Sequence, residues 1–276
     1  MRFTGERVIP DRYELKPMLQ EHLVRYEFAL PRVQGKDVLD LGCGCGYGSH
    51  LMATSGARSV VGVDLANDAL EYAQKNYRVA NLKFEQMDVT ALKYPSERFS
   101  TVVCLEVFEH VRDYEALLRE SVRVLKPGGT LVLSTPNKLV WSPHSERPIN
   151  PWHFWEFNRE DFGRIMDSHL DDVQYWCQTN SVPGIIPFIL INLRLQGYYV
   201  RSKSRVARAV EWLHGTAMKI AMLPPNLIPG AMDKNPNAIV PETEVPPKKQ
   251  HYFVAVGQKT PGRPPGLARS EAYSAV

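Results

Sequence analysis

Short runs of aliphatic and β-branched residues alternate with segments of helical periodicity between Lys36 and Asn137. Alternation of this kind is typical of βαβ units that build a mostly parallel sheet. The pattern predicts strands at 36–41, 58–63, 82–87, 99–105 and 130–135, and helices at 47–54, 67–79 and 113–125. The predicted fold class is therefore α/β, with a doubly wound sheet.

The helix at 113–125 has the clearest end signal. In Lys126-Pro127-Gly128-Gly129 a basic residue meets the helix C-terminus, proline stops the helix, and glycine permits the turn into the next strand. After Asn137 the chain becomes rich in aromatic residues, and a further helix is expected to begin at an Asn158 cap. Two more strands are expected at 171–177 and 250–257.

These elements divide the chain into five parts. They are an N-terminal leader at 1–34, a core at 35–182, a proline-containing insert at 183–247, a final core strand at 248–258 and a tail at 259–276. The tail contains Pro-Gly-Arg-Pro-Pro-Gly and has little that can pack in a core, so it is expected to be disordered.

Composition narrows the function only slightly. The 33 basic and 30 acidic side chains leave a formal net charge of +3, too small to indicate a nucleic-acid partner. No stretch approaches the ~18 continuous apolar residues of a membrane span, and the first residues do not resemble a signal peptide. Four cysteines, two of them in Cys43-Gly44-Cys45, form no disulfide or zinc pattern. A cytoplasmic location is expected.

The run from Val38 to Ser49 reads as a strand, a glycine turn and the start of a helix. Glycine lets the backbone approach a ligand closely, and the free N–H groups of a helix N-terminus suit a nucleotide-like cofactor. The dinucleotide fingerprint would need a third glycine where Tyr47 or Ser49 stands, and no Gly-Lys-Ser/Thr of a phosphate-binding loop follows.

The run Val38-Leu-Asp-Leu-Gly-Cys-Gly-Cys-Gly46 resembles the first motif of class I S-adenosylmethionine-dependent methyltransferases. Further motifs of that family follow in order: Val61-Gly-Val-Asp64, Gln86-Met-Asp88-Val89, Leu105-Glu106 and Leu125-Lys-Pro-Gly-Gly129. The resemblance implies a Rossmann-like sheet of seven strands whose last strand is antiparallel. It also implies S-adenosylmethionine as cofactor, with these binding residues: Asp40, Gly42, Cys43, Gly44, Gly46, Asp64, Leu65, Asp88, Val89 and Leu105.

Within this resemblance, the three carboxylates have separate expected roles. Asp64 would accept both ribose hydroxyl protons; it could instead cap the next helix, although Asn67 is better placed for that. Asp88 would accept from the adenine amine, or else would only stabilise a turn. Asp40 would orient the glycine loop and the methionine ammonium group.

The acceptor side is indicated by Glu106-Val-Phe-Glu109-His110. If a helix begins at Glu106, the three polar side chains share one face, and two nearby carboxylates require either a proton or a divalent cation. The pattern resembles that of small-RNA 3′-terminal 2′-O-methyltransferases, and also occurs in quinone-biosynthesis and sugar O-methyltransferases. It implies a Mg²⁺ or Mn²⁺ site at Glu106, Glu109, His110 and His153. Without metal, His110 or His153 is a candidate base beside Glu106; alternatively, Glu106 only touches the cofactor and Glu109 is solvated.

The resulting hypothesis is O-methylation of a small molecule, sugar, glycan or other natural-product intermediate. An RNA 2′-O-methyltransferase and a non-catalytic S-adenosylmethionine-binding protein remain as alternatives; a nucleic-acid partner is disfavoured because no RNA-binding module is recognised.

The leader resembles segments that close over the cofactor, so Tyr13 and Tyr26 are lid candidates or, equally, packing anchors. The apolar and basic stretch 184–208 is either a transient membrane-surface contact or a solvated helical cap. Oligomeric state is not predicted.

Overall fold

The computed structural model describes residues 7–11, 16–179 and 238–260. Its strands are β1 (Asp37–Leu41), β2 (Ser59–Asp64), β3 (Leu82–Gln86), β4 (Phe99–Leu105), β5 (Leu125–Pro136), β6 (Asp171–Gln178), β7 (Ile239–Pro241) and β8 (Tyr252–Gln258). Its α-helices are α1 (Lys16–Ala29), α2 (Tyr47–Thr54), α3 (Asn67–Asn76), α4 (Tyr114–Val124), α5 (Lys138–Trp141) and α6 (Arg159–His169). Short 3₁₀ helices are η2 (Leu30–Arg32), η3 (Phe108–His110), η5 (Glu242–Glu244) and η6 (Pro247–Lys249).

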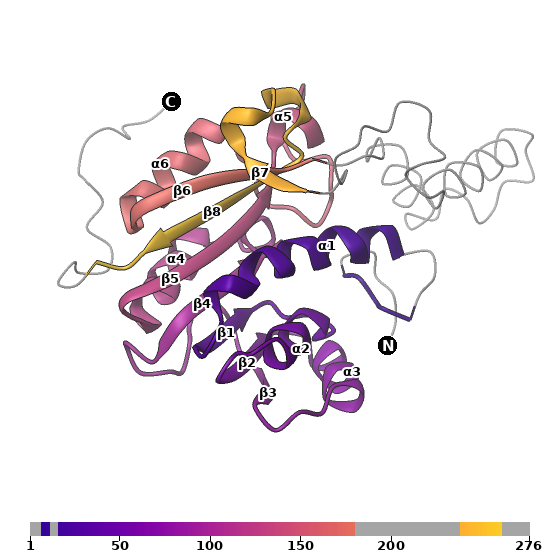
Figure 1. The fold of residues 1–276 in the computed structure, drawn as a ribbon. Helices are drawn as coiled ribbons and strands as arrows, with labels where there is room; N and C mark the ends of the chain where they lie inside the picture. The colour runs from indigo at the N-terminus through magenta and orange to yellow at the C-terminus, as the bar shows by residue number, and fades with distance from the viewer. Residues whose placement is uncertain (1–6, 12–15, 180–237, 261–276) are drawn as a thin grey trace, which may run out of the picture.

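The strands form one sheet in the order β3-β2-β1-β4-β5-β8-β6-β7 (Figure 1). The first five strands of that order are parallel, whereas β8 is antiparallel to both β5 and β6. The chain order reverses between β1 and β4, and an open α/β sheet binds ligands at the carboxyl ends of strands beside such a switch. The α/β prediction with an antiparallel final strand is confirmed. One strand was missed, because Ile239–Pro241, inside the expected insert, pairs with β6.

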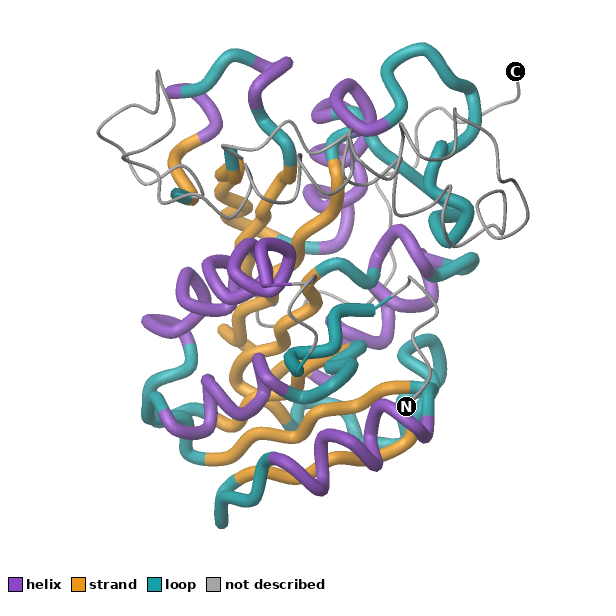
Figure 2. Tube along the Cα trace, turned by 90° about the vertical axis from the view of Figure 1, so that its right-hand side faces the viewer, coloured by secondary structure: helices purple, strands orange, loops and turns teal. Residues whose placement is uncertain are grey.

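Helices cover both faces of the sheet (Figures 1 and 2). On one face, Tyr26 of α1 and Met52 of α2 pack with Val38 of β1. On the other face, Leu117 of α4 and Phe162 of α6 pack in the cluster that contains Leu39, which follows Val38 in β1. Successive strand residues point to opposite faces, so β1 is apolar at nearly every position because both faces are buried.

The boundary between α4 and β5 lies earlier than the sequence predicted. The helix ends at Val124 and the strand begins at Leu125, because the glycine turn has become part of the strand through a register shift against β4. Lys259 fixes this turn: its backbone pairs with Gly128 and Gly129, and its Nζ donates to the Leu125 carbonyl at 2.7 Å. Lys259 is buried, so its assignment to the tail was wrong.

The expected cap of α6 is confirmed, since Asn158 Oδ1 accepts from the Asp161 N–H at 2.8 Å. Most of the insert, including 184–208, lies outside the described residues, as do Tyr13 and the tail from 261 onward. Within the described ranges, no helix has the length and apolar character needed to cross a bilayer.

Candidate active site

A cavity of about 630 Å³ opens at the carboxyl ends of β1, β2 and β4. Its walls include most of the residues implied by the methyltransferase motifs: Gly42, Cys43, Gly44, Asp64, Leu65, Asp88, Val89 and Leu105. Asp40 and Gly46 are the two members of the predicted set that do not line it. The strand ends therefore place the motifs around one space, as the topological argument requires.

Two glycines of the loop have different roles. Gly44 has φ +53°, and a Cβ added there would meet no protein atom within 4 Å. Because Gly44 lines the cavity, a side chain at this position would occupy space that a ligand needs. Gly46 has φ +82°, and a Cβ there would collide with Ala73 and Phe84. Gly46 therefore allows the loop to pack against α3 and β3, and Gly44 allows close approach of a ligand.

Asp64 ends β2 and holds the glycine loop in place. Its Oδ2 accepts from the Gly44 N–H at 2.9 Å, and its Oδ1 accepts from the Ala66 N–H, also at 2.9 Å. The expected cap at Asn67 was wrong: Ala66 occupies the cap position, and the Asn67 amide donates to Glu71 instead. Asp64 thus stabilises the entry to α3 and lines the cavity with the same carboxylate.

Asp88 stabilises a turn and also lines the cavity, so its turn role is confirmed and its adenine role stays a prediction. Its Oδ1 accepts from both the backbone N–H and the hydroxyl of Thr90, at 2.8 and 2.7 Å, which stabilises the turn after β3. Both bonds use the same oxygen, so Oδ2 is available to a ligand in the cavity that Asp88 lines. Leu65, on the same wall, is 67% exposed and offers an apolar surface.

Asp40 lies beneath the loop and does not reach the cavity. It is fully buried and accepts from the hydroxyls of Ser49 at 2.6 Å and Tyr26 at 3.2 Å. Burial raises the pKa of Asp40 to about 7, although both hydrogen bonds oppose the shift. The Tyr26 ring lies where a Cβ of Gly48 would stand. Tyr26 is therefore a buried anchor between α1 and α2.

Residues of the leader also reach the cavity wall. Arg7 and Val8 line it, and Val8 and Ile9 pack on Cys45 of the glycine loop. Nearby, the Tyr72 hydroxyl of α3 donates to Asp11 at 2.6 Å. The role of the leader as a lid stays a prediction.

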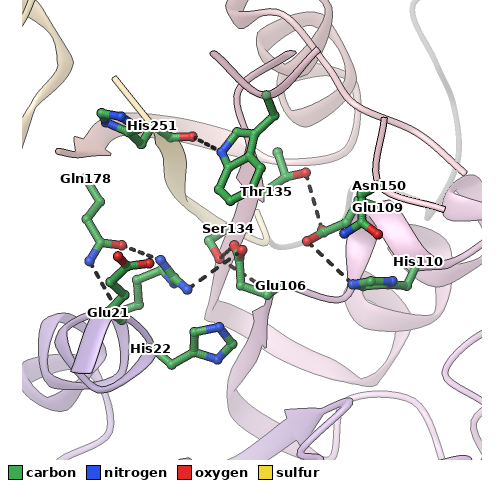
Figure 3. Close-up of polar contacts among 12 residues, drawn as sticks. Glu21, His22, Glu106, Glu109, His110, Ser134, Thr135, Asn150, Gln178 and His251 are labelled. Carbon is green, nitrogen blue, oxygen red and sulfur yellow. Dashed lines mark hydrogen bonds and ion pairs between the residues drawn. The ribbon is translucent and has the colours of Figure 1, made fainter. Parts of the chain in front are cut away.

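Glu106 does not begin a helix, contrary to expectation. It has φ +57°, a strained value for a non-glycine residue, and only the 3₁₀ helix η3 follows. Its Oε1 accepts from the Ser134 hydroxyl at 2.8 Å, and its Oε2 lies 3.7 Å from Nη2 of Arg25. Figure 3 shows Glu106 beside Ser134, turned away from Glu109.

Arg25 was missed by the sequence analysis. It is fully buried on α1, donates to Gln178 and stacks over the Tyr252 ring at 4.3 Å. Burial is the largest single influence and lowers the pKa of Arg25, but Glu106, together with Tyr252, Glu21 and Tyr47, keeps the pKa above its ordinary value. A single arginine within a helical segment does not reveal from the sequence that it will pair with Glu106.

The structure brings together three of the four predicted metal ligands. One ligand atom each from Glu109, His110 and His153 lies within 4.8 Å of the other two, and Glu106 lies outside the group. Glu109 is 1% exposed, which contradicts its alternative interpretation as a solvated residue. Burial and the nearby Glu106 raise its pKa well above the ordinary value, and its Oε1 has no hydrogen-bond partner.

His110 is held with one nitrogen available. Its Nδ1 lies 2.9 Å from the Trp152 carbonyl oxygen, which can only accept, so Nδ1 carries the proton and Nε2 keeps its lone pair. Nε2 is 4.0 Å from Glu109 Oε1 (Figure 3). Burial, together with neighbouring His153, lowers the pKa of His110 to about 4, so the imidazole is neutral at physiological pH.

His153 has partners at both nitrogens. Nδ1 donates to Glu156 at 2.8 Å, and Nε2 lies 2.7 Å from the Asn150 amide nitrogen. The Trp152 N–H donates to the other amide atom, Oδ1 of Asn150, which fixes the amide orientation. The unpaired Glu109 oxygen and His110 Nε2 therefore fit a cation, but His153 would first have to release Asn150. Two imidazoles with one carboxylate suit Mn²⁺ better than Mg²⁺, which prefers oxygen ligands.

His22, which no motif in the sequence singles out, lines the cavity. Its Nδ1 lies 2.7 Å from the Tyr47 hydroxyl, and burial lowers its pKa well below the ordinary value. No neighbouring residue in the sequence marks His22, because its hydrogen-bond partner, Tyr47, comes from α2.

Comparison with known proteins identifies the family. A family model described as a methyltransferase domain matches residues 16–171, more than half of the chain. The chain belongs to this family. The class I S-adenosylmethionine-dependent methyltransferase resemblance is thereby confirmed, and S-adenosylmethionine is the cofactor that it supports.

Individual relatives agree with this membership. A probable S-adenosylmethionine-dependent methyltransferase of Mycobacterium tuberculosis is 36% identical over 174 residues, which cover 63% of this chain and 62% of the relative. A ubiquinone biosynthesis O-methyltransferase of Pseudomonas putida is 37% identical over 130 residues, 45% of this chain and 56% of the relative. The chain thus aligns with less than two thirds of these proteins.

A solved structure supports the fold. A possible histamine N-methyltransferase of Thermotoga maritima superposes with a TM-score of 0.58 at 14% identity, covering 93% of this chain and 98% of that chain.

Proposed function

We propose that this protein transfers the methyl group of S-adenosylmethionine to a hydroxyl of a small molecule or glycan. The cofactor would bind in the cavity, with its ribose at Asp64, its adenine near Asp88 and its methionine end over Gly44. The similarity to an O-methyltransferase of Pseudomonas putida supports oxygen as the acceptor atom.

The observation that carries the proposal is the imidazole of His110 in the cavity wall, whose Nδ1 is held by the Trp152 carbonyl. A hydroxyl must lose its proton when it is methylated, so the site needs a base at the acceptor side. Trp152 fixes Nδ1 as the protonated nitrogen, which leaves Nε2 as the proton acceptor of a residue that lines the cavity.

In the proposed step, the acceptor oxygen attacks the methyl carbon of the sulfonium in line with the departing sulfur. The carbon–oxygen bond forms, the carbon–sulfur bond breaks and S-adenosylhomocysteine leaves. The acceptor proton passes to His110 Nε2. A weak base is sufficient, because the protonated ether formed by the transfer is far more acidic than an imidazolium ion.

A divalent cation is a second route to the same reaction. Glu109, His110 and His153 would hold it, and a bound cation lowers the pKa of a coordinated hydroxyl. The unpaired buried oxygen of Glu109 favours this route, and the bond between Asn150 and His153 opposes it.

The proposal is tested with S-adenosylmethionine labelled at its methyl group and a panel of sugars, phenols and short RNAs. We expect label in a hydroxyl of a sugar or phenol, and loss of turnover in His110→Ala. His50→Ala is the matched control, because His50 belongs to α2 and does not line the cavity. Transfer only to RNA would favour the RNA 2′-O-methyltransferase, whereas cofactor binding without any transfer would favour a binding protein.

Chelation separates the two routes. If His110 acts directly as the base, a chelator has no effect, and kcat/KM falls only as the pH approaches about 4, where His110 gains a proton. If a cation is required, chelation abolishes turnover and Mn²⁺ restores it.

A further inference from the structure

Four large apolar side chains are exposed on one short segment after β5. Ile149, Trp152, Phe154 and Trp155, here called the aromatic rim, have exposed fractions of 54, 39, 45 and 40%. Among the described residues, only two other large apolar side chains are comparably exposed, Leu65 in the cavity and Leu139 in α5. Exposed apolar residues that gather in one place mark a binding surface more often than scattered ones do.

The rim is hydrogen-bonded to the segment that forms one wall of the cavity. The Phe154 N–H donates to the Glu109 carbonyl at 2.8 Å, and the Trp155 indole N–H donates to the Arg112 carbonyl at 3.0 Å. His110 donates to the Trp152 carbonyl. Since both His110 and Arg112 line the cavity, the rim adjoins the wall that holds His110.

The rim offers ring faces in fixed positions. The Trp155 ring meets the Tyr114 ring edge-on at 5.5 Å, and the Arg112 guanidinium covers one face of Phe154 at 4.5 Å. The polar side chains of the same segment bind one another and not the solvent-exposed surface: His153 is hydrogen-bonded to Asn150 and to buried Glu156. The surface therefore recognises the apolar face of a ligand.

The openness of the rim distinguishes between classes of ligand. A fully apolar acceptor is normally enclosed over most of its surface, whereas these rings remain about 40% exposed. A nucleic acid needs several cations along its backbone, and the segment 149–155 contains no lysine or arginine. A sugar ring has an apolar C–H face, which can stack on an aromatic ring, and a hydroxylated edge, which can stay in water.

We propose that the aromatic rim binds a saccharide acceptor. The sugar ring stacks on Trp152 or Trp155, and one of its hydroxyls reaches His110 Nε2. This proposal rests on the proposed function, because it supplies the acceptor for the same reaction.

The test measures saccharide binding directly. Hexasaccharides of glucose and of mannose are offered at millimolar concentration to the full chain loaded with S-adenosylhomocysteine, and saturation transfer to their ring C–H protons is recorded by NMR. We expect signal with at least one saccharide, retained in Trp152→Phe and Trp155→Phe and lost in Trp152→Leu or Trp155→Leu. Leucine keeps an apolar side chain but removes the flat ring. Leu139→Ala is the matched exposed control and should bind normally.

Turnover gives a second readout. For a saccharide substrate, the leucine variants should raise KM roughly tenfold and leave kcat within about twofold, because ring stacking contributes to binding and not to the chemical step. Thermal melting checks that each variant is folded.

No saccharide binding to the wild-type protein, or equal binding in the phenylalanine and leucine variants, would overturn the proposal. Binding of phenols or short RNA in place of saccharides would overturn it too. Failure of the proposed function looks different: rim-dependent saccharide binding persists, but no labelled methyl group reaches any hydroxyl.

Discussion

The two sides of the cavity are built in different ways. The cofactor side is formed by turns that directly follow β1, β2 and β3, so each functional residue lies within a few positions of a strand end. The acceptor side joins η3 to a segment about forty residues further along the chain, through the contact between His110 and Trp152. The first depends on local backbone geometry, whereas the second depends on tertiary packing.

The consequence is a difference in what each side tolerates. On the cofactor side, backbone N–H groups and a glycine without a side chain create the space, so substitutions act by filling it or by releasing the loop. On the acceptor side, buried polar side chains orient one another, so a substitution acts through charge and proton position. A substitution on one side should therefore leave the other side unchanged.

The largest expected effect is on turnover. His110→Ala should lower kcat by about 10²- to 10⁴-fold, the usual contribution of a general base. Affinity for S-adenosylhomocysteine, measured by calorimetry, should stay unchanged because the cofactor turns are intact. An equal loss of cofactor affinity would show that the two sides are not separable at His110.

The second effect is a pH-dependent change in stability at Asp40. Its folded-state pKa of about 7 lies above the ordinary aspartate value of 3.8, so the native state holds a proton that the unfolded state has lost. The stability from this proton is present at low pH and is lost as the pH rises through 7, by roughly 4 kcal/mol at most.

Asp40→Asn removes this titration. The difference in unfolding free energy between wild type and variant, from urea titrations at pH 4 to 8, should therefore shift in favour of the variant as pH rises. A pH-independent difference would show that Asp40 is ionised throughout.

The third prediction compares two glycines. Gly44 and Gly128 both have positive φ, and a Cβ at either would meet no protein atom within 4 Å, but only Gly44 lines the cavity. Valine at either position should cost about 1–2 kcal/mol of stability through backbone strain. Only Gly44→Val should also weaken cofactor binding, by roughly tenfold or more. Matching calorimetric affinities in the two variants would contradict the cofactor placement.

The smallest expected effect is that of removing the C-terminus. Deleting residues 261–276, with Lys259 retained, should leave the melting temperature and cofactor affinity unchanged, because that composition cannot bury a core. A deletion that also removes Lys259 should lower the melting temperature, since its Nζ bond to Leu125 would be lost.

The sequence predicted the sheet and the cofactor turns because both follow local rules. Apolar alternation marks a strand, and a glycine turn after it marks the ligand edge, so Gly44, Asp64 and Asp88, predicted as cofactor-binding residues, all line the cavity. The helix expected at Glu106 failed because Ser134 and Arg25, distant in the chain, hold that residue in a left-handed conformation. His22 and Arg25 were missed because a polar residue within a helix does not show which neighbour it meets after folding.

The anchor formed by Tyr26 also bears on how this domain could be shortened. A chain that began at β1 would keep every cofactor motif, but it would lose the ring that fits over Gly48 and the hydroxyl that reaches Asp40. Water would then reach the Asp40 carboxylate, lower its pKa and loosen the turn above it. A minimal cofactor-binding fragment must therefore include α1, and hydrogen exchange in α1 should slow when the cofactor binds.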